Sequence, residues 1–217
     1  MYRVQFPAFN PYCTEPEQSV SDNRKIKKRE ATKPDMCGNR PEGNMKNIVL
    51  IGMPGAGKST TGVILAKALR RNFIDTDIMI QERSGRLLQE IIDTDGPDAL
   101  KRIEEETILS LHTRNSVIAT GGSVVFSSRS MLHLSRDGII IYLHVSFEEM
   151  EKRLRNIMTR GIILSPGETL HEMYDERIPL YERYADFTID CSDEDFEAVV
   201  GKIMRVVAPE GIVSVPS

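Results

Sequence analysis

The sequence has little of three features that would each point to a special class of protein: long apolar runs, an excess of one charge, and cysteine. No apolar run approaches the ~18 residues that span a bilayer, so we expect no membrane segment. The net charge of -4 gives no basic footprint for nucleic acid. A length of 217 residues, with 40% hydrophobic and 28% charged, predicts one soluble α/β domain with a tail.

Cysteine occurs three times, at Cys13, Cys37 and Cys191, with wide spacings that match no disulfide or metal pattern. The start of the sequence also lacks the basic and then apolar layout of a signal peptide. We therefore expect a cytoplasmic protein without a cysteine metal site.

The first 44 residues differ from the remainder, since they hold five of the eleven prolines and show no sustained apolar periodicity. We expect an extension with little fixed structure at 1–44, a folded domain at 45–208 and a flexible tail at 209–217. The basic cluster Arg24–Arg29 is typical of a solvated stretch, although RNA or an anionic surface is an alternative partner.

The segment Gly52–Thr60 matches the phosphate-binding pattern G-x-x-x-x-G-K-[ST]. An apolar run, Ile48–Ile51, precedes it and a segment of helical composition, Thr61–Arg70, follows it, which is the order of strand, loop and helix that the pattern requires. Glycines let the backbone approach phosphate oxygens, and the helix directs its free amides at them. The alternative is a chance glycine-rich turn.

Within this loop we expect Lys58 to supply a mobile cation for the outer phosphates of a nucleotide. Ser59 directly follows it and is expected to reach the Mg²⁺ that bridges those phosphates. The residues predicted to contact the nucleotide here are Gly52, Gly55, Ala56, Gly57, Lys58, Ser59 and Thr60.

Two carboxylates, Asp75 and Asp77, follow the short stretch Phe73–Ile74, where a strand is expected to end. Side chains alternate along an extended chain, so both carboxylates can point toward the ligand crevice at the carboxyl ends of the strands. We expect one to hold Mg²⁺ through water and the other to bind a substrate hydroxyl. Alternatively, Asp77 caps the helix Ile78–Ser84, a role that is compatible with catalysis.

Strand and helix patterns alternate along the folded part and predict a three-layer, doubly wound α/β fold with a five-stranded parallel sheet. The expected strands are 48–51, 73–74, 116–120, 139–145 and 187–190. The expected helices are 61–70, 78–84, 86–92, 97–112, 127–135, 146–155, 170–183 and 193–207.

Three further segments are candidates for ligand contacts. Lys101 and Glu104 share one face of a helix, although most such pairs are surface salt bridges. The segment Gly121–Ser123 exposes backbone amides at the end of a strand, or forms a plain turn. Residues 157–167 have the composition of a mobile lid, in which Arg160 would neutralise charge on a transferring phosphoryl group, or of an ordinary surface loop.

From Asn47 to about Ile203 the chain resembles the shikimate kinase family, within the nucleoside-monophosphate-kinase-like group of P-loop proteins. The family transfers the γ-phosphoryl group of ATP to the 3-hydroxyl of shikimate. The resemblance rests on the phosphate loop, Asp75-Thr76-Asp77, Thr94-Asp95-Gly96, the Lys101 to Glu104 helix, Ala119-Thr120-Gly121-Gly122, Arg160 and Arg177-x-Pro-Leu-Tyr.

The resemblance implies the catalytic group and the metal site. Asp77 would bind the acceptor hydroxyls and could take the proton, while Lys58 and Arg160 would neutralise charge on the phosphates. Asp75 would help Ser59 to hold Mg²⁺.

The resemblance also implies the substrate contacts. Arg177 would bind the carboxylate of the acceptor together with Lys101, and Gly121 and Gly122 would shape the pocket. Arg153 would stack on adenine.

Three positions depart from the family pattern. Lys101 stands where the family has an arginine, Ser123 stands where it commonly has a third glycine, and Arg160-Gly161-Ile162 replaces Arg-Pro-Leu. Lysine keeps the charge of arginine but loses its two-pronged fork.

The expected function is therefore ATP- and Mg²⁺-dependent phosphorylation of shikimate by a monomer, with no nucleic acid or membrane as partner. Two alternatives stay open. One is a kinase of the same fold that acts on another hydroxylated carboxylic acid, and the other is a nucleotide-binding module without transferase activity.

Overall fold

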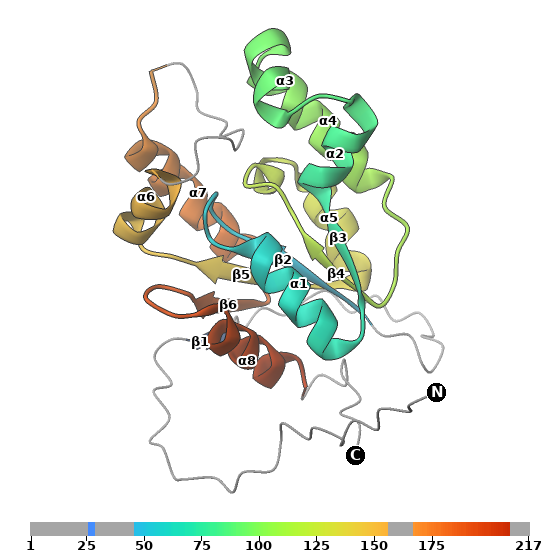
Figure 1. Ribbon diagram of the computed structural model, residues 1–217, viewed down its shortest axis with the longest axis vertical. Helices are drawn as coiled ribbons and strands as arrows, with labels where there is room; N and C mark the ends of the chain where they lie inside the picture. Colours follow the sequence, from blue (N-terminus) through green and yellow to red (C-terminus); the bar gives the residue numbers. More distant parts are fainter. Residues whose placement is uncertain (1–25, 29–45, 156–166, 209–217) are drawn as a thin grey trace, which may run out of the picture.

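The computed structural model describes residues 26–28, 46–155 and 167–208, and its centre is a sheet covered by helices on both faces (Figure 1). Five strands run parallel, which confirms the predicted sheet. The spatial order of the strands is β1 (Ile26–Lys28), β6 (Phe187–Asp190), β5 (Gly138–His144), β2 (Asn47–Ile51), β4 (Ser116–Ala119) and β3 (Asn72–Asp75).

The first strand, β1, is an addition that the sequence analysis did not expect. It pairs antiparallel with β6, so that Ile26 lies opposite Ile189 and Lys28 lies opposite Phe187. Three residues of the basic cluster therefore extend the sheet at one edge. The other residues of the extension and the tail 209–217 lie outside the described residues.

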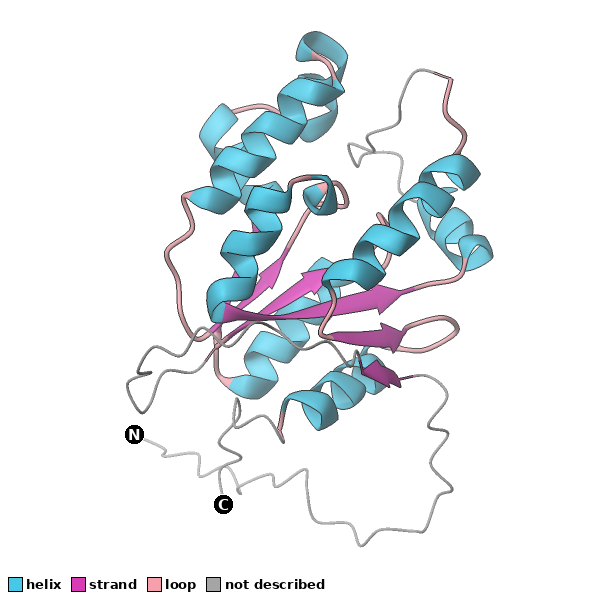
Figure 2. Ribbon diagram, turned by 180° about the vertical axis from the view of Figure 1, so that it is seen from behind, coloured by secondary structure: helices cyan, strands magenta, loops and turns pink. Residues whose placement is uncertain are grey.

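Helices lie on both faces of the sheet, as a doubly wound fold requires. In front of the sheet in Figure 1 lie α1 (Lys58–Leu69) and α8 (Phe196–Val207). On the other face lie α5 (Ser128–Asp137) and α7 (Leu170–Tyr184), as Figure 2 shows, and α4 (Pro97–Leu109) packs against α5.

Three shorter helices stand near the carboxyl edge of the parallel strands. They are α2 (Thr76–Ser84), α3 (Leu88–Asp95) and α6 (Phe147–Arg155). Since α2 follows β3 and α6 follows β5, both begin where those strands end. This edge is the one at which doubly wound sheets bind ligands.

The core fixes the position of the segment that follows β2. All five residues of β2 are buried, and β2 lies between β4 and β5 in the middle of the sheet. A side chain at Gly62 of α1 would lie 2.6 Å from the ring of Phe73, so glycine lets α1 approach the sheet closely. The loop between β2 and α1 is therefore held at both ends by packed elements.

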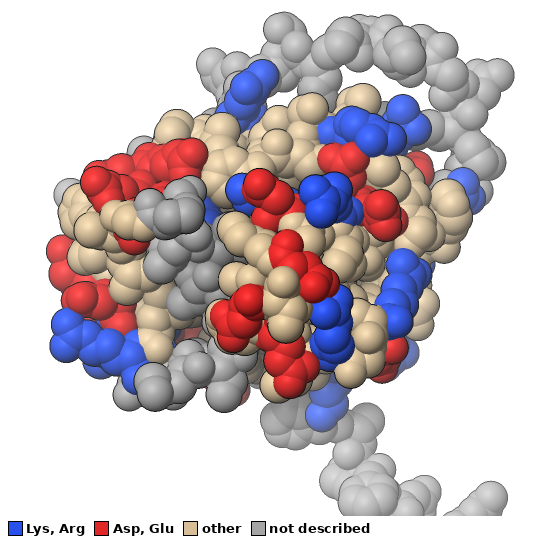
Figure 3. Space-filling view, turned by 90° about the horizontal axis from the view of Figure 1, so that it is seen from above, with Lys and Arg blue, Asp and Glu red and all other residues tan. Residues whose placement is uncertain are grey.

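The face seen from above carries acidic and basic side chains beside one another (Figure 3). This mixture is in keeping with the small net charge of -4. Within the described ranges, no helix has the length and apolar character needed to cross a membrane.

Candidate active site

The predicted phosphate loop lies between β2 and α1, and its glycines have backbone angles that other residues rarely adopt. The φ angles are 146° at Gly52, 81° at Gly55 and 87° at Gly57. A Cβ atom at Gly52 would lie 2.5 Å from the carbonyl oxygen of Leu143 on β5, so this position also has no room for a side chain. Gly57 is the N-cap of α1, which begins at Lys58 and not at Thr61 as expected.

Lys58 bends back over this loop. Its Nζ atom donates hydrogen bonds to the carbonyl oxygens of Gly52, at 2.7 Å, and Met53, at 2.9 Å. Its ammonium group is thereby held beside the first turn of α1, whose free N–H groups have no acceptor within the helix. This position fits the predicted role on phosphates. Ser59 is partly buried next to it, whereas Thr60 is exposed.

The two aspartates after β3 have different surroundings. Asp75 is the N-cap of α2, and its Oδ1 atom accepts hydrogen bonds from the amides of Asp77 (3.0 Å) and Ile78 (3.3 Å). The alternative in which Asp77 caps this helix is therefore wrong. Asp77 instead lies in the first turn of α2, and its carboxylate lines a cavity.

This cavity brings together residues from α2, α3, α4, α7, the phosphate loop and the segment after β4. Four of the predicted substrate-binding residues line it, which are Asp77, Gly121, Gly122 and Arg177. We refer to it as the acceptor cavity. The described residues that line it are Pro54, Asp77, Ile80, Leu88, Leu100, Glu104, Gly121, Gly122, Ser123 and Arg177.

The motif Arg177-x-Pro-Leu-Tyr holds the wall of the acceptor cavity in place. Arg177 and Tyr181 are four residues apart on α7, and both donate to the carbonyl oxygen of Gly122, at 3.4 Å and 2.6 Å. Arg177 is only 2% exposed. The motif thus fixes the glycine segment and places a buried cation at the cavity.

Lys101 is not among the described residues that line the acceptor cavity, but it lies at the same aromatic ring as Arg177. The Nζ atom of Lys101 is 5.5 Å from the ring centre of Phe126, and the Cζ atom of Arg177 is 5.3 Å from the same ring centre. The expected surface pair of Lys101 with Glu104 is not formed, since Lys101 pairs with Asp98 at 3.3 Å.

Glu104 is a residue of the acceptor cavity whose role the sequence analysis missed. It is 4% exposed, the hydroxyl of Ser123 donates to its Oε2 atom, and its buried Oε1 atom has no hydrogen-bond partner among the described residues. Burial raises the pKa of its carboxyl group to about 7; the hydrogen bond from Ser123 lowers it and the charge of Asp77 raises it. Helical spacing in the sequence could have indicated that Glu104 is buried, because it lies four residues from both Leu100 and Ile108, which are buried.

The raised pKa of Glu104 predicts a pH effect on stability. The unfolded chain releases this proton near pH ~4.3, but the folded protein keeps it to about pH 7, so stability falls as the pH rises through this window. We expect Glu104→Gln to remove this loss. The free energy of unfolding of the variant, relative to wild type, should rise by on the order of 3 kcal/mol between pH 4 and pH 8 in urea titrations. A difference that is the same at all pH values would contradict a neutral, buried Glu104.

Arg153 lies on the other side of the phosphate loop. Its guanidinium group donates to Glu149 (2.7 Å) and to the carbonyl oxygens of Gly55 (3.4 Å) and Cys191 (3.3 Å). It therefore lies beside the phosphate loop, next to Gly55.

Cys191, whose carbonyl oxygen accepts one of these hydrogen bonds, has a buried thiol. Burial raises the pKa of the Cys191 thiol to about 12, so this cysteine is not a nucleophile.

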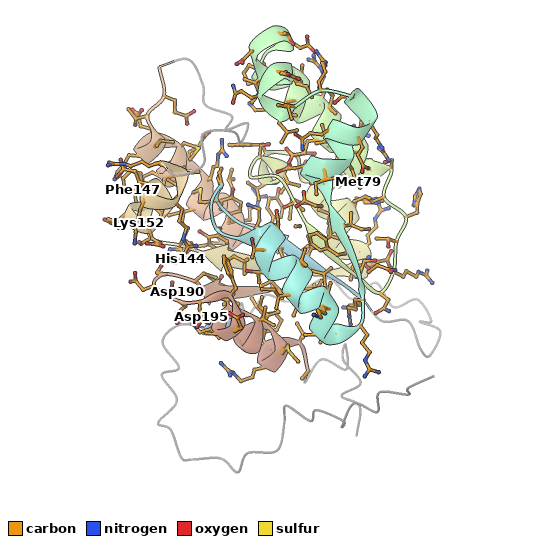
Figure 4. The ribbon with its side chains drawn as sticks, viewed as in Figure 1. Met79, His144, Phe147, Lys152, Asp190 and Asp195 are labelled. Atoms are coloured by element: carbon orange, nitrogen blue, oxygen red, sulfur yellow. The ribbon has the colours of Figure 1, made fainter. Side chains whose placement is uncertain are left out.

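A second group of polar side chains lies at the ends of β5 and β6, as Figure 4 shows. His144 and Asp190 lie side by side at the ends of β5 and β6, with 3.7 Å between Nδ1 and Oδ1. Asp195 caps α8, and Phe196 of that helix packs against Gly57. Arg160 and residues 157–166 of the expected lid lie outside the described residues.

A larger cavity, of about 450 Å³, lies at the opposite edge of the sheet. Its lining includes Asn47, Arg114, His133 and Asp137. Asn47 begins β2 and Asp137 precedes β5, so this cavity is at the amino ends of the strands, away from the phosphate loop. The acceptor cavity, which adjoins the loop, is the candidate active site.

Comparisons with known proteins identify the family of this chain. The model of the family described as shikimate kinase matches residues 54–208. The shikimate kinase of Thermodesulfovibrio yellowstonii is 39% identical over 164 residues, which cover 74% of this chain and 94% of that protein. The shikimate kinase of Caldanaerobacter subterraneus subsp. tengcongensis is 35% identical over 164 residues, which cover 74% of this chain and 95% of that protein.

Among solved structures, the shikimate kinase of Acinetobacter baumannii in complex with shikimate has a TM-score of 0.71 and 28% sequence identity to this chain. The match covers 76% of this chain and 94% of that one. The fold, the matched region and the identity to several relatives all lead to the same conclusion: the chain belongs to the shikimate kinase family.

Proposed function

We propose that this chain transfers the γ-phosphoryl group of ATP to the 3-hydroxyl of shikimate, giving shikimate 3-phosphate and ADP. One observation carries the proposal: Pro54 of the phosphate loop forms part of the wall of the acceptor cavity. A Cβ atom at Gly122 would lie 3.0 Å from the ring of Pro54, so the two sites share a boundary. A phosphate on the loop and an alcohol in the cavity would therefore be neighbours.

In the proposed mechanism, the side chains of the enzyme position the acceptor hydroxyl and neutralise the charge of the phosphoryl group. Asp77 orients the acceptor hydroxyl and accepts its proton, while Lys58 and Arg160 stabilise the charge on the phosphoryl group. Ser59 and Asp75 would hold Mg²⁺, since both lie at the carboxyl edge of the sheet and Asp75 is a buried carboxylate. The ion would neutralise phosphate charge when bound.

Two cations are available to bind the carboxylate of the acceptor. Arg177 is buried at the acceptor cavity, and Lys101 lies at the same Phe126 ring. Backbone groups of Gly121 and Gly122 bound the space for the ring of the acceptor. We further propose that Arg153 contacts adenine, that residues 45–208 form the kinase domain, and that the protein acts as a cytoplasmic monomer.

We refer to Lys101 and Arg177, the two cations proposed to bind the carboxylate, as the acid-binding site. Lys101→Arg tests this site with a small change. Arginine restores a planar fork that can bind a carboxylate through two hydrogen bonds. We expect the KM for shikimate to stay the same or fall by up to about fivefold, while kcat and the KM for ATP change less than about twofold. Arg102→Lys, on the exposed side of the same helix, is the control. A clear rise in the KM for shikimate would contradict the expectation that arginine can replace lysine at position 101 in binding the carboxylate of the acceptor.

The function is tested by coupled ADP-release assays with a panel of acceptors. Shikimate should support the highest kcat/KM, and related hydroxylated acids should support little turnover. A different preferred acid would identify a kinase of the same fold with another substrate. ATP binding without turnover on any acceptor would identify a nucleotide-binding module.

A further inference from the structure

Phe126 is an aromatic residue with two cations at one ring. It ends a short 3-10 helix, Val124–Phe126, whose two valines are buried, whereas Phe126 is 37% exposed. The ring therefore does not serve the core as the valines do. Lys101 Nζ lies 5.5 Å and Arg177 Cζ 5.3 Å from its centre, both within the range of a cation–π interaction.

The two cations come from different helices. Lys101 belongs to α4 and Arg177 to α7, and like charges brought close together repel. The negative face of an aromatic ring attracts both charges without adding a net charge of its own. An acidic side chain at this place would instead occupy the cations and compete with a carboxylate ligand.

The other partner of Lys101 is too weak to hold it. Asp98 is on the same helix, and its side chain is 81% exposed. Exposed pairs of this kind add little order to a lysine head group. Phe126 is therefore the contact that holds the head group of Lys101 at the ring that Arg177 also approaches.

We propose that Phe126 is a positioning residue of the acid-binding site, which holds Lys101 and Arg177 together so that both cations meet the carboxylate of the acceptor. The inference rests on the proposed function and deepens it. Lysine at position 101 lacks the rigid fork of arginine, so an external group that fixes its direction matters more.

Phe126→Leu removes the ring but keeps an apolar side chain. We expect the KM for shikimate to rise about five- to tenfold, with kcat and the KM for ATP within about twofold of wild type. Phe126→Tyr, which keeps the ring, should retain the wild-type KM. In a Lys101→Arg background, the effect of Phe126→Leu should be smaller.

The methyl ester of shikimate separates charge positioning from simple contact. It lacks the negative charge, so its KM should not change between wild type and Phe126→Leu. An equal rise for the acid and the ester would mean that the ring only packs on the substrate. An unchanged KM for shikimate, or a Tyr variant as poor as the Leu variant, would also overturn the proposal.

A second measurement does not depend on turnover. In NMR spectra of the ligand-free protein, the side-chain protons of Lys101 should show an upfield ring-current shift that Phe126→Leu abolishes. An absent shift in wild type would overturn the proposal even if the enzyme were active. If wild type did not use shikimate, the proposed function would fail, and this shift would still decide whether Phe126 holds Lys101.

Discussion

Asp77→Asn is expected to lower kcat for shikimate phosphorylation by about 10²–10⁴-fold, because asparagine cannot accept the proton of the attacking hydroxyl. The change keeps the size of the side chain and does not affect the cap of α2, which Asp75 provides. ATP affinity, measured by calorimetry, should therefore stay within about twofold of wild type. The expected pattern is a loss in kcat with nucleotide binding intact.

Glu82→Gln is a matched control on the same helix, since Glu82 is exposed. It should leave kcat and both KM values unchanged. If Asp77→Asn kept more than about a tenth of the wild-type kcat, Asp77 would not be the proton acceptor. A loss of ATP binding in this variant would instead point to a structural role.

Gly121→Ala is expected to lower kcat/KM for shikimate by about 10²-fold or more through shape alone. A Cβ atom there would collide with Glu104 Oε1 and lie 2.9 Å from Asp77 Oδ1, so the methyl group would enter the acceptor cavity beside the carboxylate that we propose as the proton acceptor. Gly121 has no positive φ angle, so alanine fits the backbone. The phosphate loop does not include this position, and ATP binding should persist.

Gly201→Ala is the control for the loss of a glycine. Gly201 lies within α8, and the nearest atom to a Cβ there would be 3.9 Å away. Alanine favours the helix, so this variant should be as stable as wild type and fully active. Retention of wild-type kcat/KM by Gly121→Ala, with an unchanged melting temperature, would contradict the position of the acceptor cavity.

The parts of the fold that could be predicted from sequence are those that local patterns determine. Continuous apolar runs such as Ile48–Ile51 form buried parallel strands, and the phosphate-loop pattern fixes the strand and helix around it. Local patterns do not determine the residue at which each helix begins. Asp75 and Asp77 can both cap a helix, and only the backbone geometry assigns the cap to Asp75.

The parts that could not be predicted depend on contacts between distant segments. Glu104 meets Ser123 across 19 residues, and Phe126 meets Lys101 and Arg177 from two other elements. Sequence spacing shows which face of a helix a residue shares, but not which loop packs on that face. The strand β1 has three residues and no alternating pattern, so only its pairing with β6 reveals it.

The most direct test of the central claim is to incubate the purified chain with ATP, Mg²⁺ and shikimate and to measure ADP and the phosphorylated product together. We predict ADP release that depends on shikimate and an equal amount of shikimate 3-phosphate, identified by mass spectrometry. ADP release that is independent of shikimate, or no phosphorylated product at any acceptor concentration, would contradict transfer from the loop to the acceptor cavity.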